Sequence, residues 1–147
     1  MEVPVRRLAL VAVLGCLLSA PALLAHTQAP AAKAGYVPPV KGIATIDVVQ
    51  VPSKRVGKEM VTVLKIKNTS KGSINLLKAD EYWYDPSMKI VSGAPTYAHK
   101  KAPIQPGEII EITLRSPIPA GVTLHQNQVM FRHANGDAKA TKVKAFK

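Results

Sequence analysis

The sequence has few groups for covalent or metal chemistry. Its only cysteine, Cys16, lies in an apolar N-terminal run, so a chain cut after that run has neither a disulfide nor a thiolate ligand. The four histidines, His26, His99, His125 and His133, lack the HxH or HExxH spacing of a zinc site. A site built from His99, His125 and a carboxylate is the alternative, but surface histidines are the simpler interpretation. We therefore predict no metal and no cofactor.

Catalytic motifs are also missing. The sequence contains no glycine-rich phosphate loop and no serine in a nucleophile elbow. Its one acidic cluster is Asp80, Glu81 and Asp85. On a strand, Asp80 and Glu81 face opposite ways, and Asp85 most simply accepts hydrogen bonds within its own turn. We predict that the chain has no catalytic residues, is not an enzyme and has no small-molecule substrate.

Aromatic and acidic residues are scarce. Aromatics make up 5% of the chain, and 9 Asp and Glu face 20 Lys and Arg, a net charge of +11. Few aromatics argue against nucleic acid, because unpaired bases stack on aromatic rings. The excess lysine suits an anionic polymer such as lipopolysaccharide, a cell-wall polymer or nucleic acid. A solvated basic surface is the simpler interpretation.

The N-terminus has the pattern of a secretory signal peptide over residues 1–25. Arg6 and Arg7 precede the apolar run Leu8–Leu18, and small residues and a proline follow as far as Ala25. The pattern predicts an exported protein, periplasmic or extracellular.

Three alternatives stay open for this segment. Cleavage could follow Ala22 instead of Ala25. Val13-Leu14-Gly15-Cys16 is similar to a bacterial lipobox, which would attach a lipid anchor at Cys16. The run could also stay uncleaved as an anchor, although it is short for a transmembrane span.

Residues 26–40 are rich in Ala and Pro and predict an extended tether, and residues 41–147 predict one β-sandwich domain. From Lys41 onward the apolar residues recur with a period of 2, which is typical of strands. We expect seven or eight short strands in an all-β, immunoglobulin-like antiparallel sandwich. The expected strands are Ile43–Val51, Met60–Lys67, Ile74–Tyr84, Ile90–Val91, Thr96–Ala98, Glu108–Arg115, Gln128–His133 and Lys139–Phe146, with Asn135-Gly136 as a hairpin turn.

The strand Ile74–Tyr84 is expected to be central. It contains the only tryptophan, Trp83, which alternation places with Leu77 and Ala79 on the core face. Glu81 interrupts that apolar face. Lys78, Tyr82 and Tyr84 then point outward.

Part of the chain resembles the FxLYD-type domains of exported bacterial proteins. The similarity rests on Lys65–Ser70, on Trp83-Tyr84-Asp85 followed by a turn and Ile90-Val91, and on Ile104–Glu108. It covers roughly Thr62 to Ser116, and Glu81 and Trp83 depart from the family's phenylalanine and leucine. The resemblance implies an immunoglobulin-like sandwich outside the bacterial cytoplasmic membrane, and it implies no activity.

These observations predict a non-catalytic exported module for interaction or an accessory role, monomeric, whose partner is a protein or an envelope component. The alternative is a lysine-rich protein that binds a polyanion. The predicted binding residues are Tyr82, Tyr84, Lys78, Lys65, Lys67, Lys142 and Lys144.

Overall fold

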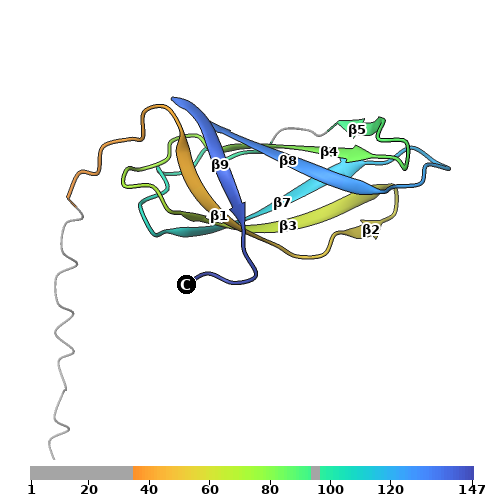
Figure 1. Ribbon diagram of the computed structural model, residues 1–147, viewed down its shortest axis with the longest axis horizontal. Helices are drawn as coiled ribbons and strands as arrows, with labels where there is room; N and C mark the ends of the chain where they lie inside the picture. The colour runs from red at the N-terminus through yellow and green to blue at the C-terminus, as the bar shows by residue number, and fades with distance from the viewer. Residues whose placement is uncertain (1–34, 94–96) are drawn as a thin grey trace, which may run out of the picture. The chain divides into compact units, whose positions relative to one another are not determined.

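The computed structural model describes residues 35–93 and 97–147 (Figure 1). The predicted signal peptide, the lipobox at Cys16 and His26 lie outside these residues. The described residues form strands, turns and loops, which confirms the prediction of an all-β fold. Within these residues no helix is long and apolar enough to span a membrane.

The described residues contain nine strands, which form one curled, mixed sheet in the order β2-β3-β1-β9-β8-β4-β5, with β6 beside β4 and β7 beside β3. The strands are β1 (Ala44–Gln50), β2 (Lys54–Val56), β3 (Glu59–Asn68), β4 (Lys78–Tyr84), β5 (Ile90–Gly93), β6 (Tyr97–Ala98), β7 (Ile109–Pro117), β8 (Gln126–His133) and β9 (Gly136–Lys142).

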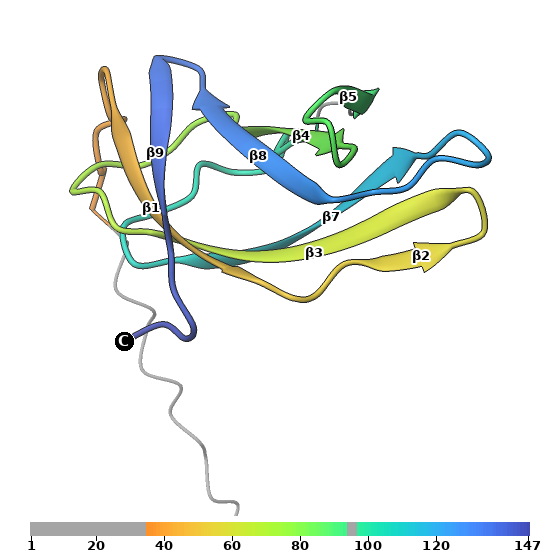
Figure 2. The same cartoon turned by 45° about the vertical axis from the view of Figure 1, so that its right-hand side comes forward.

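The sheet curls so that its two halves face each other. In Figures 1 and 2, β4 of one half lies above β3 of the other half. The halves are joined by β1 and β9, which pair in parallel from Ala44 opposite Ala138 to Val48 opposite Lys142. The prediction of a purely antiparallel arrangement is therefore wrong at this one pair. The whole domain, rather than a tight turn, separates β1 from β9, so their connection does not require them to run in opposite directions.

The core lies between the facing halves and is built by alternation. Every second residue of β1, β3 and β7 points inward, and β4 adds Ala79. The buried apolar cluster is Ala44, Ile46, Val48, Leu64, Ile66, Ile74, Leu77, Ala79, Ile104, Ile112, Leu114, Phe131 and Ala138. At about 25 cal/mol per Å² of apolar surface, burial of these side chains is the main stabilising term.

Local backbone geometry explains where the strands differ from the prediction. The long strand expected from Ile74 begins only at Lys78, because Leu76 has φ +51° and interrupts the extended backbone. Ile74 forms an isolated bridge with Ile104 instead. The polar connection expected at Pro52–Lys58 contains a short strand, β2, which turns back onto β3 at Gly57, where φ is +61°.

The β8–β9 hairpin turns one residue earlier than the predicted Asn135-Gly136, at Ala134-Asn135, because Gly136 already pairs with His133 as the first residue of β9. Asn135 does not have a positive φ, and Gly136 has φ +152°. A Cβ at Gly136 would lie 2.2 Å from the Gly42 carbonyl oxygen. Close approach of the chain before β1 therefore requires this glycine.

The last residues of the predicted tether bond to the domain. The Val40 N–H donates to the Ser73 carbonyl oxygen at 2.9 Å, and the Ser73 N–H donates to the Pro38 carbonyl oxygen at 3.0 Å. These bonds form a short parallel bridge between Pro39 and Ser73.

Candidate interaction surfaces

The seven predicted binding residues fall into two groups on different strands. Lys78, Tyr82 and Tyr84 lie on the outer side of β4. The lysines lie on β3 and at the end of β9 and beyond it, at Lys65, Lys67, Lys142 and Lys144. Because β4 and β3 belong to facing halves of the sheet, the two groups do not form one surface (Figure 1).

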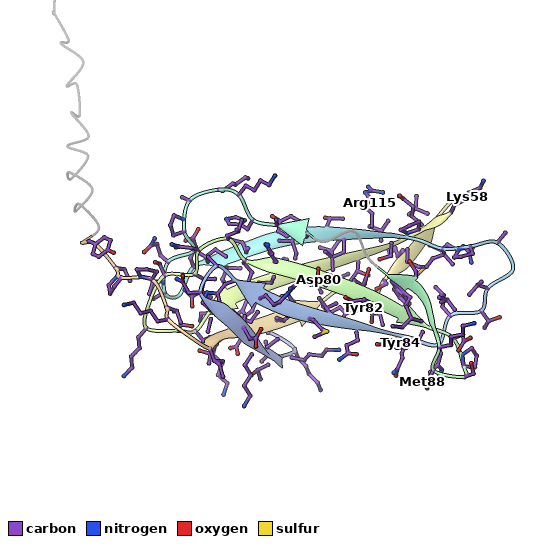
Figure 3. The ribbon with its side chains drawn as sticks, turned by 90° about the horizontal axis from the view of Figure 1, so that it is seen from above. Lys58, Asp80, Tyr82, Tyr84, Met88 and Arg115 are labelled. Carbon is purple, nitrogen blue, oxygen red and sulfur yellow. The ribbon has the colours of Figure 1, made fainter. Side chains whose placement is uncertain are left out.

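Two members of the first group, Tyr82 and Tyr84, belong to a surface that we call the tyrosine face, while Lys78 lies at the other end of β4 and outside it. The tyrosine face lies across β8, β4 and β5, where register sets Gln128 opposite Tyr82 and Gln126 opposite Tyr84, with Ile90 on the other side of Tyr84. Its residues are Tyr82, Tyr84, Met88, Ile90, Gln126 and Gln128. Figure 3 shows Tyr82 and Tyr84 in sequence along β4, with Met88 beyond them. The six side chains carry no formal charge.

Hydrogen bonds orient the side chains of the tyrosine face. The Tyr84 hydroxyl donates to Oε1 of Gln128 at 3.1 Å. The Gln126 side-chain amide contacts the Met88 sulfur at 3.7 Å. Tyrosine and methionine are enriched at protein–protein interfaces because they bury a large apolar area while keeping a polar or polarisable group.

Met88 has an unusual backbone for its side chain. Its φ is +64°, in the left-handed region, and the residue is 52% exposed. This conformation costs an L-residue roughly 1–2 kcal/mol, and glycine would adopt it without that cost. An exposed apolar side chain at a strained turn position is a feature that stability alone does not favour.

The turn that holds Met88 is organised by Asp85. One oxygen of its carboxylate, Oδ1, accepts hydrogen bonds from the Ser87 hydroxyl at 2.7 Å and from the Ser87 and Lys89 N–H groups at 2.9 Å. The Met88 N–H donates to the Asp85 carbonyl oxygen at 3.0 Å. The Ser87 hydroxyl bond, followed by the Lys89 N–H bond, lowers the pKa of Asp85. The predicted role of Asp85 in its own turn is confirmed.

An ion pair lies beside the tyrosine face on the same side of β4. The Arg132 guanidinium donates to Asp80 at 2.6 Å, and this bond raises the pKa of Arg132. Asp80 points outward and Glu81 points inward, which confirms that the two are not a carboxylate pair.

Beneath the tyrosine face, the interior is polar. Glu81 has no exposed surface and accepts hydrogen bonds from the Ser116 hydroxyl at 2.5 Å and from the Asn127 amide at 2.7 Å. Trp83 is buried as predicted, at 6% exposure, but it lies outside the main apolar cluster. Its Nε1 has no partner among the described residues. Glu81 thus bonds to side chains of β7 and β8 from β4.

Two lysines of the second group, Lys67 and Lys144, lie close together around one hollow. Lys67, Lys144 and Lys147 line a hollow of about 560 Å³ on the outer side of β3, β1 and β9. Asp47 lines the same hollow, and the Lys67 ammonium donates to the Lys147 main-chain oxygen at 2.6 Å. Lys65 lies farther along β3 and reaches Glu111 at 4.0 Å. Part of the positive charge is therefore already neutralised within the chain.

The histidines differ from the prediction of surface positions. His125 is exposed, but His99 and His133 are only 8% and 7% exposed. Nε2 of His133 is 2.8 Å from the Gly42 carbonyl oxygen, and Nδ1 of His99 is 3.4 Å from the Tyr97 hydroxyl. Across residues 35–93 and 97–147, no three His, Cys, Asp or Glu side chains are placed to share a metal ion.

Sequence reasoning identified both tyrosines but missed their neighbours. The expected strand at Gln128–His133 began two residues too late to include Gln126. Met88 lies in the turn between β4 and β5, and a positive φ at methionine has no signature in the sequence. The exposure of Ile90 depends on its position opposite Tyr84 in β5.

The chain matches no protein-family model and no curated protein.

Proposed function

We propose that this chain is an exported, non-catalytic interaction module that binds a protein or envelope partner through the tyrosine face. The observation that carries the proposal is Met88, an exposed apolar side chain held at a strained φ of +64° in the surface that contains Tyr82 and Tyr84. Two tyrosines, two glutamines, a methionine and an isoleucine form the mixed apolar and hydrogen-bonding composition that protein interfaces favour.

The same proposal includes an immunoglobulin-like sandwich and an exported location. The facing halves of the sheet and their alternating burial are consistent with a sandwich. The location rests on the signal-peptide pattern of residues 1–25 and on the resemblance to FxLYD-type domains. A likeness in fold does not determine function, so the functional part of the proposal rests on the tyrosine face.

Site-specific photocross-linking in cells that express the full chain tests the proposal. The cross-linking amino acid replaces Ile90 in the tyrosine face or, as a control, Val56 on β2; these residues are 51% and 55% exposed. We expect one discrete adduct from position 90, absent from position 56 and reduced several-fold by Tyr84→Ser. Equal labelling from both positions, or an adduct insensitive to Tyr84→Ser, would contradict the proposal.

Polyanion binding through the lysines is the second candidate. It is favoured by the shared hollow of Lys67, Lys144 and Lys147. A salt titration of heparin binding tests it, because each neutralised anionic group steepens the fall of affinity with salt. Lys67→Glu with Lys144→Glu should flatten that slope, while Lys100→Glu with Lys101→Glu, on an exposed loop, serves as the charge-matched control. Equal slopes for the two double variants would rule out the hollow as the polyanion-binding site.

A further inference from the structure

The outer edge of β7 is a long strand edge without a partner. β7 pairs with β3 over its whole length, from Glu59 opposite Pro117 to Lys67 opposite Ile109. No other strand among the described residues pairs with β7. Exposed strand edges are templates for another extended chain, because their N–H and C=O groups point into solvent.

The pairing pattern shows which backbone groups point to this edge. At the two ends of the β3–β7 ladder, the Ile118 N–H donates to the Lys58 carbonyl at 2.7 Å and the Asn68 N–H donates to the Glu108 carbonyl at 3.0 Å. Antiparallel bonding alternates, so the even-numbered residues of β7 bond to β3. The N–H and C=O groups facing away from β3 therefore belong to Ile109, Glu111, Thr113 and Arg115.

The free stretch has a defined length. Between Ile109 and Arg115 the strand has no proline, and its register with β3 is continuous. At its end, Pro117 lacks an N–H, and its carbonyl oxygen accepts the Ser92 hydroxyl at 2.6 Å. Strand addition is thus open up to Arg115 and closed at Pro117.

We propose that a second copy of this chain pairs with β7 across a two-fold axis, antiparallel, with Thr113 opposite Thr113 of the other copy. This register sets Glu111 opposite Arg115 twice, once on each side of the axis. The backbone N–H and C=O groups of Glu111, Thr113 and Arg115 face the free edge, and the side chains of these residues lie on the exposed side of the sheet. Opposite charges and threonine pairs are favourable cross-strand neighbours.

Other registers lose this complementarity. If the second copy is shifted by four residues in one direction, Glu111 faces Glu111 of the other copy. A shift of four residues in the other direction makes Arg115 face Arg115 of the other copy. A slide of two residues sets both charges opposite uncharged residues. Charge therefore selects one register of the self-pairing, and a like-charge pair penalises the four-residue slides.

The existing ion pairs of this edge extend the same pattern. Lys65 is 4.0 Å from Glu111, and Glu59 is 3.3 Å from Arg115. Both pairs are largely exposed, so they hold their side chains weakly and leave them able to reach a second partner. Pairing across the edge would align Lys65, Glu111 and Arg115 of the other copy in a row of alternating charge. The resulting dimer departs from the expected monomer.

The inference is independent of the tyrosine face. Figure 3 places Arg115 at the opposite margin from Tyr84 and Met88. A dimer through β7 would leave both tyrosine faces accessible, and paired binding sites gain avidity when their targets are also paired.

Sedimentation equilibrium of the protein purified from cells expressing the full chain tests the dimer with three variants. Glu111→Arg and Arg115→Glu each create like-charge pairs across the axis and should raise the dimer dissociation constant about tenfold or more. The double variant restores opposite charges in exchanged positions and should recover the dimer. Arg55→Glu, on the β2 edge of the same sheet, is the charge-matched control and should leave the dimer unchanged.

Several outcomes overturn the inference. These are a chain that stays monomeric, assemblies larger than a dimer, single variants that dimerise normally, and a double variant that is not rescued. Amide hydrogen exchange gives a second readout: Glu111, Thr113 and Arg115 should gain protection as concentration rises, while Ile112 and Leu114, bonded to β3, should stay protected throughout. Equal protection of both sets at low concentration would also contradict it.

Discussion

At the scale of single residues, Glu81 bonds the two halves of the sheet together beneath the tyrosine face. It comes from β4 and accepts hydrogen bonds from Ser116 on β7 and Asn127 on β8. Glu81→Ala would leave both donors unsatisfied in the interior and also open a cavity. We expect a loss of about 2–4 kcal/mol in the free energy of unfolding, measured by urea denaturation.

The exposed Glu111 provides the matched control for that loss. Glu111→Ala removes the same side chain from the surface of β7 and should change stability by less than about 0.5 kcal/mol. The measurement is made at a concentration well below that used for sedimentation. Equal losses for the two variants would show that Glu81 has no special role in the interior.

Asp85 gives the domain a pH dependence. Its pKa is lowered in the folded protein, first by the Ser87 hydroxyl bond, so its carboxylate stabilises the fold at pH values above the unfolded pKa. That stabilisation is lost as pH falls through the folded pKa, which lies below 3.8. Asp85→Asn should therefore lower the melting temperature at pH 7 and approach the wild-type value near pH 2. A difference that stays constant between these pH values would contradict this account.

Side-chain orientation was the part of the site that the sequence predicted best. Alternation correctly placed Trp83 inside and Tyr82 and Tyr84 outside, because the period of a strand is 2. The partners of Glu81 were not predictable, since Ser116 and Asn127 come from strands far away in the sequence. The positive φ of Met88 was not predictable for a different reason, because it is imposed by the hydrogen bonds of the Asp85 turn.

At the scale of elements, the β8–β9 hairpin depends on the chain that precedes β1. Gly136→Ala would place a Cβ 2.2 Å from the Gly42 carbonyl oxygen, and backbone atoms must move to accommodate it. We expect a loss of about 2 kcal/mol or more in stability, visible as a lower melting temperature.

A control at Gly121 separates the cost of a steric clash from the cost of a positive φ in the stability loss expected for Gly136→Ala. It has φ +75°, and a Cβ there would meet no atom within 4 Å. Gly121→Ala should therefore cost only the strain of a left-handed alanine, about 1 kcal/mol. If the two alanine variants lost equal stability, the Gly42 contact would not be the reason for Gly136.

Strand positions followed from the sequence more closely than strand partners did. The alternating runs at Met60–Lys67 and Glu108–Arg115 correspond to β3 and β7. The parallel pairing of β1 with β9 and the free edge of β7 have no local signature, because pairing depends on residues far apart in the chain.

At the scale of the whole molecule, the charged side chains lie outside the surface that we propose for recognition. The sequence has a net charge of +11, yet the tyrosine face carries no charged side chain. Two lysines on the outer side of β3 have carboxylate or carbonyl neighbours of the same chain, Lys65 at Glu111 and Lys67 at the Lys147 main-chain oxygen. The proposed interface is therefore uncharged, although the chain as a whole is basic.

The central claim is that Met88 serves recognition rather than stability. Met88→Gly removes the side chain and relieves the left-handed strain, so the free energy of unfolding should stay the same or rise by up to about 1 kcal/mol. The deciding measurement is the photocross-linking yield from position 90 in this variant. We predict a several-fold loss of the adduct from a fully folded protein; an undiminished adduct would contradict the role of the tyrosine face.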